Sequence, residues 1–470
     1  MKMYGAKNSS RWVGFLFLQT NKNNRFYKRH YQCDNIFGFK KKESINFKVS
    51  DEVIRKRNEN SNFYRLVTAY RQHAHRVASI NPIALTATSS LPELEPKYYG
   101  FDNNAIVDFE GILNARQKQG SIHEALEFLK SAYCQSVGVE FYHLQTEEER
   151  EWFAENYELC ITEELDYVTK IRIATDLLKS QAFDHFMASK FVSVKRYGGE
   201  GAESMMAFFR EFFRLCAMSE LEQIVIGMPH RGRLNFLTAF LNLSPTKIFA
   251  KLRGKPDFPA TFEATGDILS HLIASTDINV NNRCLHVSVV YNPSHLEAAL
   301  PVSMGKTRAK QMMWQDGDYS KSNCKWSDKV LNLQIHGDAA LAGQGVNQET
   351  LQLSRVPHFE VGGSVHLVVN NQLGYTTPAE RGRSSAYCTD VAKMLPVPVL
   401  HVNGDDPEMV LKATRVAFAY QRKFRKDVFI DFNCYRQWGH NELDDPTFTN
   451  PATYKIIHAR DTEFICEKID

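Results

Sequence analysis

The pattern of hydrophobic and polar positions changes at about residue 190 of this chain. Before that point, apolar residues recur at helical spacing, as in FYRLVTAYRQHAHRV at 63–77, which predicts amphipathic helices. The stretch SIHEALEFLKSAYC at 121–134 adds a capping box, because Glu124 follows Ser121 by three residues. We therefore expect residues 51–190 to form a helical N-terminal region.

Beyond about residue 220, short apolar and β-branched runs alternate with polar loops and helices. The runs predicted to be strands are QIVIGM (223–228), LHVSVVY (285–291), VLNLQIH (330–336), SVHLVVN (364–370), VPVLHV (397–402) and DVFIDFN (427–433). Several are almost continuously apolar, which is typical of parallel strands covered on both faces, and helical stretches such as 406–424 lie between them. This predicts an α/β fold with a doubly wound, mostly parallel sheet within 191–470.

A polar segment follows each predicted strand directly. The segments are PHRGRLN, NPSHLEA, GDAALAGQG, NQLGYTT, NGDDPE and YRQWGHNELDDP. Ligands of open α/β sheets bind beyond the carboxyl ends of the strands. We therefore expect the six segments to form one site.

Composition and charge narrow the class of protein. A chain of 470 residues with 43% hydrophobic and 24% charged residues is typical of a globular protein, and it contains no apolar run near the roughly 20 residues of a membrane helix. Residues 1–50 hold 11 Lys and Arg against Asp34 and Glu43, which predicts a mitochondrial transit segment or, alternatively, a disordered solvated tail. The rest of the chain has no concentrated basic face, which disfavours nucleic-acid binding.

The nine cysteines show no CxxC spacing. This argues against a zinc site or a redox pair, and reduced thiols fit a matrix or cytosolic compartment.

Familiar phosphate-binding and hydrolase motifs are absent. After Gly343 and Gly345, Gln348 stands where a dinucleotide fingerprint needs its third glycine, and the MGKT at 304–307 has Leu300 where a P-loop needs its first. HExxH and GxSxG do not occur.

Asp338 and Asn371 form a different pattern. The helix expected at 339–354 and a strand separate them, and a right-handed crossover brings both loops to one edge of the sheet. Carboxylate, amide and carbonyl oxygens suit Mg²⁺, while Ala339 and the small residues after it would let a diphosphate approach the N-terminus of the following helix. The alternative is that Asp338 only caps that helix.

GDA followed about 30 residues later by NN resembles the thiamine diphosphate and magnesium signature of 2-oxo acid dehydrogenases. With GMPHRGRLN, NPSHLEA, HGDAALAGQG, VVNNQLGYTT and CYRQWGHNELDDP, the chain resembles the decarboxylating component of the 2-oxoglutarate dehydrogenase family over about 60–460. The segments at 195–205, 265–272 and 370–385 are more similar to its 2-oxoadipate branch. The resemblance implies a thiamine diphosphate-binding fold.

The resemblance also implies roles for individual residues. Asp338 and Asn371 would bind Mg²⁺ through side chains and Leu373 through its carbonyl, whereas Arg231 and His440 would hold thiamine diphosphate. His230 and His271 would face a 2-oxo acid, because imidazoles bind carboxylates and exchange protons near neutral pH. As alternatives, His271 is a satisfied core histidine on a helix, and Arg231 and His440 pair structurally with Glu442 or Asp444.

Three positions bear on the substrate. Tyr197, Ser270 and Tyr375 stand where the 2-oxoglutarate branch has phenylalanine, tyrosine and phenylalanine. Ser270 lacks the tyrosine ring, and Tyr197 and Tyr375 each add a phenol hydroxyl to the pocket wall. These differences favour a diacid one methylene longer than 2-oxoglutarate, so we expect 2-oxoadipate as substrate, with residual activity on 2-oxoglutarate. Alternatively, Ser270 only faces a different neighbour.

The resemblance further implies a lipoyl domain of a dihydrolipoyl acyltransferase core as partner, a homodimer and the mitochondrial matrix as location. It implies a second, pyrimidine-binding transketolase-like domain, which we do not find in these 470 residues. We therefore expect the chain alone not to turn over substrate. Two hypotheses stay open: an enzyme component, and a non-catalytic module that binds cofactor or complex.

Overall fold

The computed structural model describes residues 47–460 except 86–89, 265, 318–319 and 321–323. The predicted leader at 1–50 therefore lies outside the described residues, apart from its last four positions. The described residues belong to one compact unit. The predicted boundary near residue 190 coincides with the end of a long helix, α6 (Tyr167–Lys190), and the division into two domains stays a prediction.

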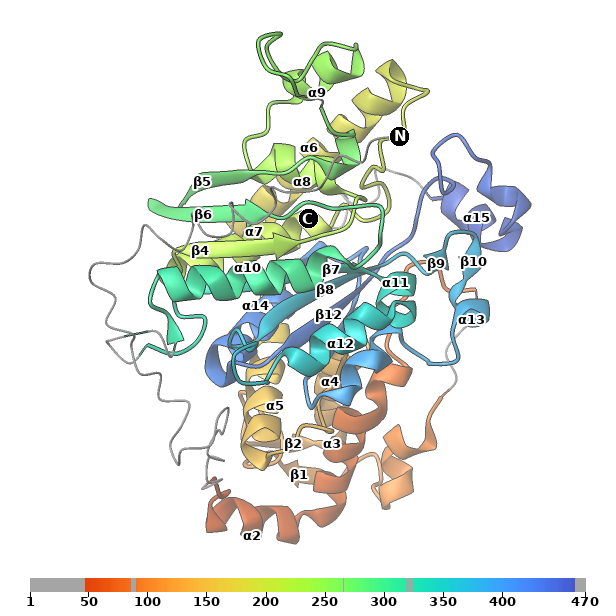
Figure 1. The fold of residues 1–470 in the computed structure, drawn as a ribbon. Coiled ribbons are helices and arrows are strands. Elements are labelled where there is room, and N and C mark those ends of the chain that lie inside the picture. Colours follow the sequence, from red (N-terminus) through yellow and green to blue (C-terminus); the bar gives the residue numbers. More distant parts are fainter. Residues whose placement is uncertain (1–46, 86–89, 265, 318–319, 321–323, 461–470) are drawn as a thin grey trace, which may run out of the picture. The chain divides into compact units, whose positions relative to one another are not determined.

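The described part of the chain contains a sheet of eight strands in the order β3-β11-β12-β8-β7-β4-β6-β5 (Figure 1). The strands are β3 (Val137–Glu140), β4 (Gln223–Gly227), β5 (Ser275–Val280), β6 (Arg283–Val289), β7 (Val330–Gly337), β8 (Ser364–Asn370), β11 (Val399–Asn403) and β12 (Val428–Asn433). The six inner strands are parallel, and the two edge strands, β3 and β5, are antiparallel to their neighbours. The predicted α/β fold with a mostly parallel sheet is confirmed.

The strand order creates a switch point between β4 and β7. The chain leaves β4 for β6 on one side and then crosses back to β7 on the other side. Gly227 at the end of β4 pairs with Gln334 of β7, and Gly337 at the end of β7 pairs with Val369 of β8. Loops that follow these three strands therefore start at one edge of the sheet, where such folds bind ligands.

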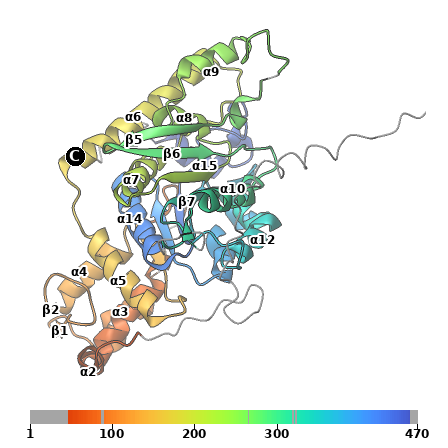
Figure 2. The same cartoon turned by 60° about the vertical axis from the view of Figure 1, so that its left-hand side comes forward.

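Helices cover both faces of the sheet. In Figures 1 and 2, α10 (Ala299–Met313), α11 (Asp338–Gly343) and α12 (Gly345–Leu353) lie on one face, and α7 (Met205–Met218) and α14 (Pro407–Phe424) lie on the other. Phe209 of α7 packs on Phe236 with ring centroids 4.2 Å apart. Phe236 belongs to the helix at 233–240, so this contact joins two helices, and each such fully buried side chain contributes about 1.5 to 3 kcal/mol.

The N-terminal region is helical, as predicted. Its helices are α2 (Asp51–Glu59), α3 (Ser61–His73), η1 (Ala74–Arg76), α4 (Ile122–Tyr133), α5 (Glu147–Ile161) and α6, with a small hairpin of β1 (Ile106–Asp108) and β2 (Gln119–Ser121). The capping box of α4 is present, because Ser121 Oγ accepts from Glu124 N and Glu124 Oε2 accepts from Ser121 N. This region also supplies β3, so it is joined to the sheet by backbone hydrogen bonds.

The remaining elements of the described residues are short. They are η2 (Pro92–Leu94), η3 (Pro96–Tyr99), α8 (Arg233–Phe240), α9 (Pro245–Leu252), η4 (Leu269–His271), β9 (Leu373–Gly374), β10 (Thr377–Pro378), α13 (Ala379–Gly382), η6 (Cys388–Met394), η7 (Pro446–Phe448) and α15 (Pro451–His458).

Two local predictions are wrong. The helix expected at 339–354 is divided into α11 and α12 at Gln344, whose ψ of 113° is not helical, because glycines on both sides disfavour continuation. His271 lies in the single 3-10 turn η4 and not on an α-helix.

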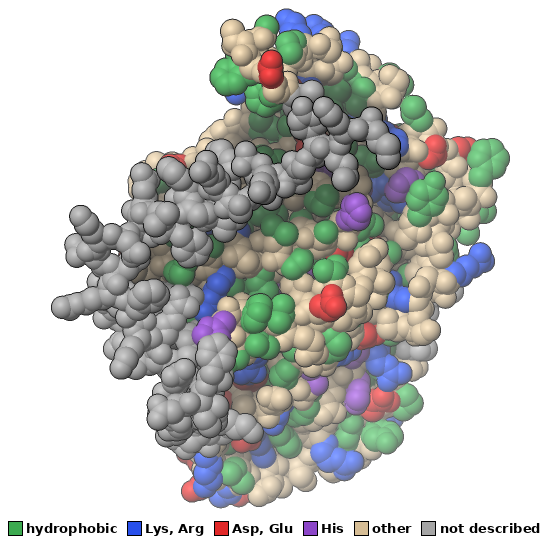
Figure 3. All heavy atoms as spheres, viewed as in Figure 1, with side chains coloured by type: hydrophobic (Ala, Val, Ile, Leu, Met, Phe, Trp, Pro, Cys, Tyr) green, Lys and Arg blue, Asp and Glu red, His purple; other side chains and the backbone are tan. Residues whose placement is uncertain are grey.

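The surface and the cysteines add little chemistry. No helix in the described ranges is long and apolar enough to cross a membrane. On the lower part of the face in Figure 3, Lys and Arg side chains are interspersed with Asp and Glu. The cysteines within the described ranges are all free.

Candidate cofactor site at the carboxyl ends of the strands

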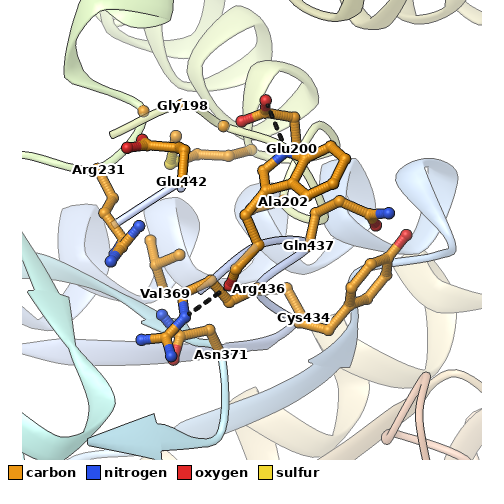
Figure 4. A pocket seen from close by; sticks show the side chains of 15 residues that line it. Gly198, Glu200, Ala202, Arg231, Val369, Asn371, Cys434, Arg436, Gln437 and Glu442 are labelled. Atoms are coloured by element: carbon orange, nitrogen blue, oxygen red, sulfur yellow. Dashed lines mark hydrogen bonds between the residues drawn. The ribbon is translucent and has the colours of Figure 1, made fainter. Parts of the chain in front are cut away.

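Loops after β4, β8 and β12 enclose a pocket together with the segment that precedes α7. The pocket holds about 460 Å³ of empty space, part of it open to solvent (Figure 4). Its lining residues are Gly198, Gly199, Glu200, Ala202, Met205, Arg231, Gly232, Val369, Asn371, Cys434, Tyr435, Arg436, Gln437, Trp438 and Glu442. The predicted convergence of strand-end loops on one site is thus observed for these loops.

The glycine-rich segment at 198–201 lies directly against the chain after β12. Gly201 has a φ of +86°, and a Cβ there would come within 2.3 Å of the Tyr435 carbonyl oxygen. Tyr435 N also donates to Gly201 O at 3.3 Å. Only glycine fits this close approach, which shapes one wall of the pocket.

Arg231 joins two walls of the pocket. Its Nη2 donates to the His440 carbonyl at 2.9 Å, and its guanidinium lies 5.4 Å from the centroid of the Tyr197 ring. Burial and the nearby Arg436 lower the pKa of Arg231 to about 10, so this cation is incompletely compensated. The alternative pairing with Glu442 does not form as a hydrogen bond, because both Glu442 oxygens lack a partner among the described residues.

His230 lies beside Arg231 and stacks edge-on against Tyr197, with centroids 4.4 Å apart. Burial, followed by the charges of Arg231, His440 and His271, lowers the pKa of His230 to about 4. His230 is therefore neutral at pH 7 and can both donate and accept a hydrogen bond. His271 approaches from η4, where its Nδ1 is 3.1 Å from Asp267 Oδ1, and its side chain is 20% exposed, so it is not a core histidine.

The two remaining substrate candidates lie in different surroundings. Tyr375 follows β9 with a φ of +57° and is 65% exposed, and its ring lies 4.3 Å from that of His440. Ser270 is the residue before His271 in η4 and is half-buried. Tyr197 and Tyr375 thus flank the Arg231 and His440 pair, while Ser270 belongs to the turn that carries His271.

Sequence reasoning missed Arg436 and Glu200 as pocket residues, and it considered Glu442 only as a structural partner of Arg231 or His440. Arg436 donates from Nη2 to the Tyr375 carbonyl at 2.7 Å and from Nε to the Trp438 carbonyl at 3.2 Å. Glu200 accepts from the Trp438 indole at 3.1 Å, as Figure 4 shows. Glu442 extends into the same space. All three stand in or beside quoted motifs, and a search for charged residues within GGEGAES and YRQWGHNE would have found them.

Asp338 is the first residue of α11, directly after β7, and is 2% exposed. The N-cap of α11 is Gly337, so Asp338 occupies the first helical position and not the N-cap, and no side-chain cap bond is present at the N-cap in the described chain. Burial raises the pKa of the Asp338 carboxyl to about 7, although Arg383, with Nη1 3.8 Å away, acts in the opposite direction. This carboxylate is buried and only weakly paired.

Asn371 and Leu373 occupy the turn after β8, beside α11. Asn371 Oδ1 accepts from Leu373 N at 3.2 Å, which folds the turn back on itself. Leu373 is buried, and the residue opposite it in β10 is Pro378, which has no N–H to donate to the Leu373 carbonyl. A Cβ on Gly374 would lie 2.9 Å from that of Ala339, so the turn and the start of α11 are in close contact.

These residues fit a hard divalent cation. Among the described residues, no three His, Cys, Asp or Glu side chains gather as a metal site. One carboxylate, one amide oxygen and one backbone carbonyl are nevertheless the oxygen ligands that Mg²⁺ uses when water and phosphate complete its shell. A cation would also compensate the buried charge of Asp338.

The residues of the pocket also fit a diphosphate, but through arginine side chains and not, as expected, through the N-terminus of the helix after β7. The break at Gln344 leaves α11 with six residues, too short for its N-terminus to serve as an anion site by itself. The positive potential comes instead from Arg231 and Arg436, two guanidinium groups that face one pocket. An anion between them would relieve their mutual repulsion.

Comparison with known proteins places the chain in a family. Residues 214–464 match the family model "Dehydrogenase E1 component". The chain is 52% identical over 405 residues to the "2-oxoadipate dehydrogenase complex component E1" of Homo sapiens, which covers 84% of this chain. It is 48% identical over 429 residues to the protein of that name from Danio rerio, covering 90% of this chain, and 38% identical over 421 residues to "2-oxoglutarate dehydrogenase, mitochondrial" of Dictyostelium discoideum, covering 86%.

The match covers 43%, 46% and 41% of those three relatives, so the chain spans less than half of their length. The family model covers more than half of the chain, and the identity to the human relative extends over most of it. The chain belongs to the dehydrogenase E1 component family.

Proposed function

We propose that this chain forms the magnesium- and diphosphate-binding part of a thiamine diphosphate-dependent 2-oxo acid dehydrogenase component, with 2-oxoadipate as the favoured substrate. The observation that carries the proposal is one edge of the sheet, where weakly paired Asp338 meets the turn of Asn371 and Leu373. The names of the relatives support the same activity.

Asp338, Asn371 and the Leu373 carbonyl would hold Mg²⁺, and Arg231, Arg436 and His440 would hold the diphosphate. When bound, thiamine diphosphate supplies the carbanion and the electron sink that decarboxylation needs. The protein supplies placement and charge. The small side chain of Ala339 would leave room for the cofactor beside Asp338, and Gly374 packs directly against it.

His230 and His271 would face the 2-oxo acid. The low pKa of His230, caused first by burial, keeps it neutral beside Arg231, so it can donate a hydrogen bond to a substrate oxygen or accept one from it. Tyr197, Ser270 and Tyr375 would set the length of diacid that fits. One methylene discriminates by about 1 to 3 kcal/mol, so a 10- to 200-fold preference is the expected scale.

The remaining length of the relatives would supply the aminopyrimidine side of the cofactor site. By the same proposal the full protein is a homodimer in the mitochondrial matrix and transfers its acyl product to the lipoyl domain of a dihydrolipoyl acyltransferase core. The name of the Dictyostelium relative supports the mitochondrial location.

The test uses the full-length protein. We expect Mg²⁺-dependent binding of thiamine diphosphate and release of CO₂ from 2-oxoadipate, with kcat/KM about 10- to 200-fold above that for 2-oxoglutarate. Asn371→Ala should weaken cofactor binding at least about 10-fold, whereas Asn104→Ala, at an exposed position, should not change it.

The outcomes separate the hypotheses. Cofactor binding without CO₂ release from either acid would identify a non-catalytic binding module. A preference for 2-oxoglutarate would retain the activity and overturn the roles of Tyr197, Ser270 and Tyr375. Cofactor binding that does not depend on Mg²⁺ or on Asn371 would overturn the site.

A further inference from the structure

A buried histidine of β11, His401, lies between two carboxylates. Its Nδ1 is 2.7 Å from Asp431 Oδ2, its Nε2 is 3.0 Å from Glu140 Oε1, and the residue is 0% exposed. A carboxylate only accepts hydrogen bonds, so both ring nitrogens donate and the ring carries a positive charge. Burial alone would lower the pKa of His401, but the hydrogen bonds to Asp431 and Glu140 outweigh it and raise the pKa to about 9.

One arm of this arrangement reaches the magnesium-binding turn. The other oxygen of Asp431, Oδ1, accepts from Asn370 Nδ2 at 3.0 Å. Asn370 is the last residue of β8, and its Oδ1 accepts from Gln372 N at 3.2 Å. Asn370 therefore fixes the backbone on both sides of Asn371. The chain of bonds from His401 ends at the turn that carries Asn371 and Leu373.

The other arm reaches the helical N-terminal region. Glu140 is the last residue of β3 and also pairs with Lys393 of η6. His75 of η1 lies 3.8 Å from Glu140 and shares a hydrogen bond of 2.9 Å with the Tyr387 hydroxyl. The Tyr387 ring in turn stacks on His401 with centroids 4.0 Å apart. The same histidine thus contacts groups from both parts of the chain.

The charges around His401 come from each element packed on it. They are Asp431 on β12, Glu140 on β3, His75 on η1, and Lys393 and Asp390 on η6, with the Tyr387 and Cys388 side chains beside them. Burial opposes ionisation of Glu140, but His401 and Lys393 prevail and lower its pKa to about 2. Burial lowers the pKa of His75 to about 4. His401 is therefore the cation that directly bridges Glu140 and Asp431.

We infer that His401 is a positioning residue for the magnesium-binding turn, acting through Asp431 and Asn370 and connecting that turn to the helical N-terminal region. The inference rests on the proposed function, because it concerns the same metal. Substitution of outer partners of metal ligands typically lowers metal affinity 10- to 100-fold. Glutamine has no ring with donors on two sides and cannot donate to both carboxylates as His401 does. Asp431 would therefore lose its fixed orientation.

The experiment measures the Kd for Mg²⁺ of the full-length protein at a fixed, saturating concentration of thiamine diphosphate. We expect His401→Gln to raise this Kd about 10- to 100-fold. The control is His286→Gln, which removes another histidine that pairs with an aspartate at 2.7 Å, on β6 near the far edge of the sheet. It should change the Kd less than about 2-fold.

Two further measurements separate positioning from general stability. Asn370→Ala breaks the same connection at its other end. The Kd of the double variant with His401→Gln for Mg²⁺ should therefore not exceed the higher of the two single-variant Kd values. Nitrogen NMR of labelled histidine should show both ring nitrogens of His401 protonated at pH 8. If His401→Gln does not fold, Asn370→Ala and the NMR signature carry the test.

Each outcome has one meaning. A full-length protein that binds neither Mg²⁺ nor thiamine diphosphate overturns the proposed function together with this inference. If the wild type binds both normally, three results would overturn the inference alone. They are additive effects in the double variant, an unchanged Kd in His401→Gln or Asn370→Ala, and a neutral His401 at pH 8.

Discussion

Two combinations of arginine and glutamate, one buried and one half-buried, show how differently this chain treats charge in its two regions. In the helical region, Arg71 is 3% exposed and binds Glu158 through two bonds, with Nε 2.9 Å from Oε1 and Nη2 3.1 Å from Oε2. Glu158 also accepts from the Tyr133 hydroxyl and from Asn114. Burial alone would lower the pKa of Arg71, but Glu158 raises it above the ordinary value.

At the sheet edge, Arg231 and Glu442 face the same pocket without such a network. Arg231 donates to a backbone carbonyl, and its pKa falls because burial and Arg436 are not offset. Both oxygens of Glu442 are buried and lack a partner among the described residues. Uncompensated buried charge is costly, so its presence at one edge marks groups whose partners belong to a ligand. The first pair stabilises the fold, whereas the second lies in the pocket of the proposed cofactor site.

Glutamate removal should separate the two pairs most clearly. Glu158→Ala leaves Arg71 charged without its partner, so we expect it to lower the free energy of unfolding by about 3 to 5 kcal/mol. Glu442→Ala removes a carboxylate that has no hydrogen-bond partner among the described residues, so it should leave stability within about 1 kcal/mol of wild type or raise it. Denaturant unfolding of both variants measures this difference, and equal losses would break the comparison.

Asp338→Asn extends the comparison to the proposed metal ligand. We expect the variant without cofactor to be at least as stable as wild type, because a buried and weakly paired charge is removed. Mg²⁺-dependent binding of thiamine diphosphate should weaken about 100-fold, at the upper end of what metal-site substitutions cost. Thermal melting and calorimetric titration report the two effects separately. A variant with lower stability and unchanged binding would contradict the assignment.

The pH dependence of stability tests whether His401, which contacts both regions, is a buried cation. Because its pKa is raised to about 9 in the fold, its contribution is fully present below about pH 6.5, the ordinary histidine value, and is lost as pH rises through 9. We expect a loss on the order of 2 kcal/mol between these limits in wild type and none from this source in His401→Gln. Unfolding midpoints at pH 6.5 and 9.5 provide the measurement, and parallel pH profiles would argue against a charged His401.

The capping box of α4 should give the smallest effect. Ser121→Ala removes the acceptor for Glu124 N and should cost about 1 kcal/mol, because α4 packs five buried residues into the core of the helical region. Ser50→Ala at the N-cap of α2 is the matched control, since α2 buries no residue and can fray without consequence. Comparable losses of unfolding free energy in the two variants would show that the effect of the N-cap does not depend on how the helix packs into the core.

The inner strands could be predicted from the sequence because they are buried on both faces and hence almost continuously apolar. The edge strands could not. In β5 only Ile278 is buried, so its pattern does not differ from that of a loop, and β3 has four residues whose partner lies far along the chain. The break at Gln344 was also missed, because two flanking glycines lower helix propensity without showing where the helix ends.

The site shows the same division between local and distant information. Asp338 and Asn371 could be found because strand order brings the ends of neighbouring strands together. Arg436 stood inside a motif that was expected at the same site as Arg231, but the sequence did not single it out from the other side chains of that motif. His401 could not be found at all, because its significance comes from Glu140 and Asp431, which approach it from two other strands.

The antiparallel pairing of β3 with β11 also bears on how the protein is made. β3 leaves the ribosome roughly 260 residues before the strand on which it docks. At about 5 to 20 residues per second, that interval is on the order of 10 to 50 s. Throughout it the nascent helical region exposes the edge of β3 and the Glu140 carboxylate without the histidine that later neutralises it. Chaperone binding during synthesis should therefore concentrate on this region and end when residue 403 has emerged.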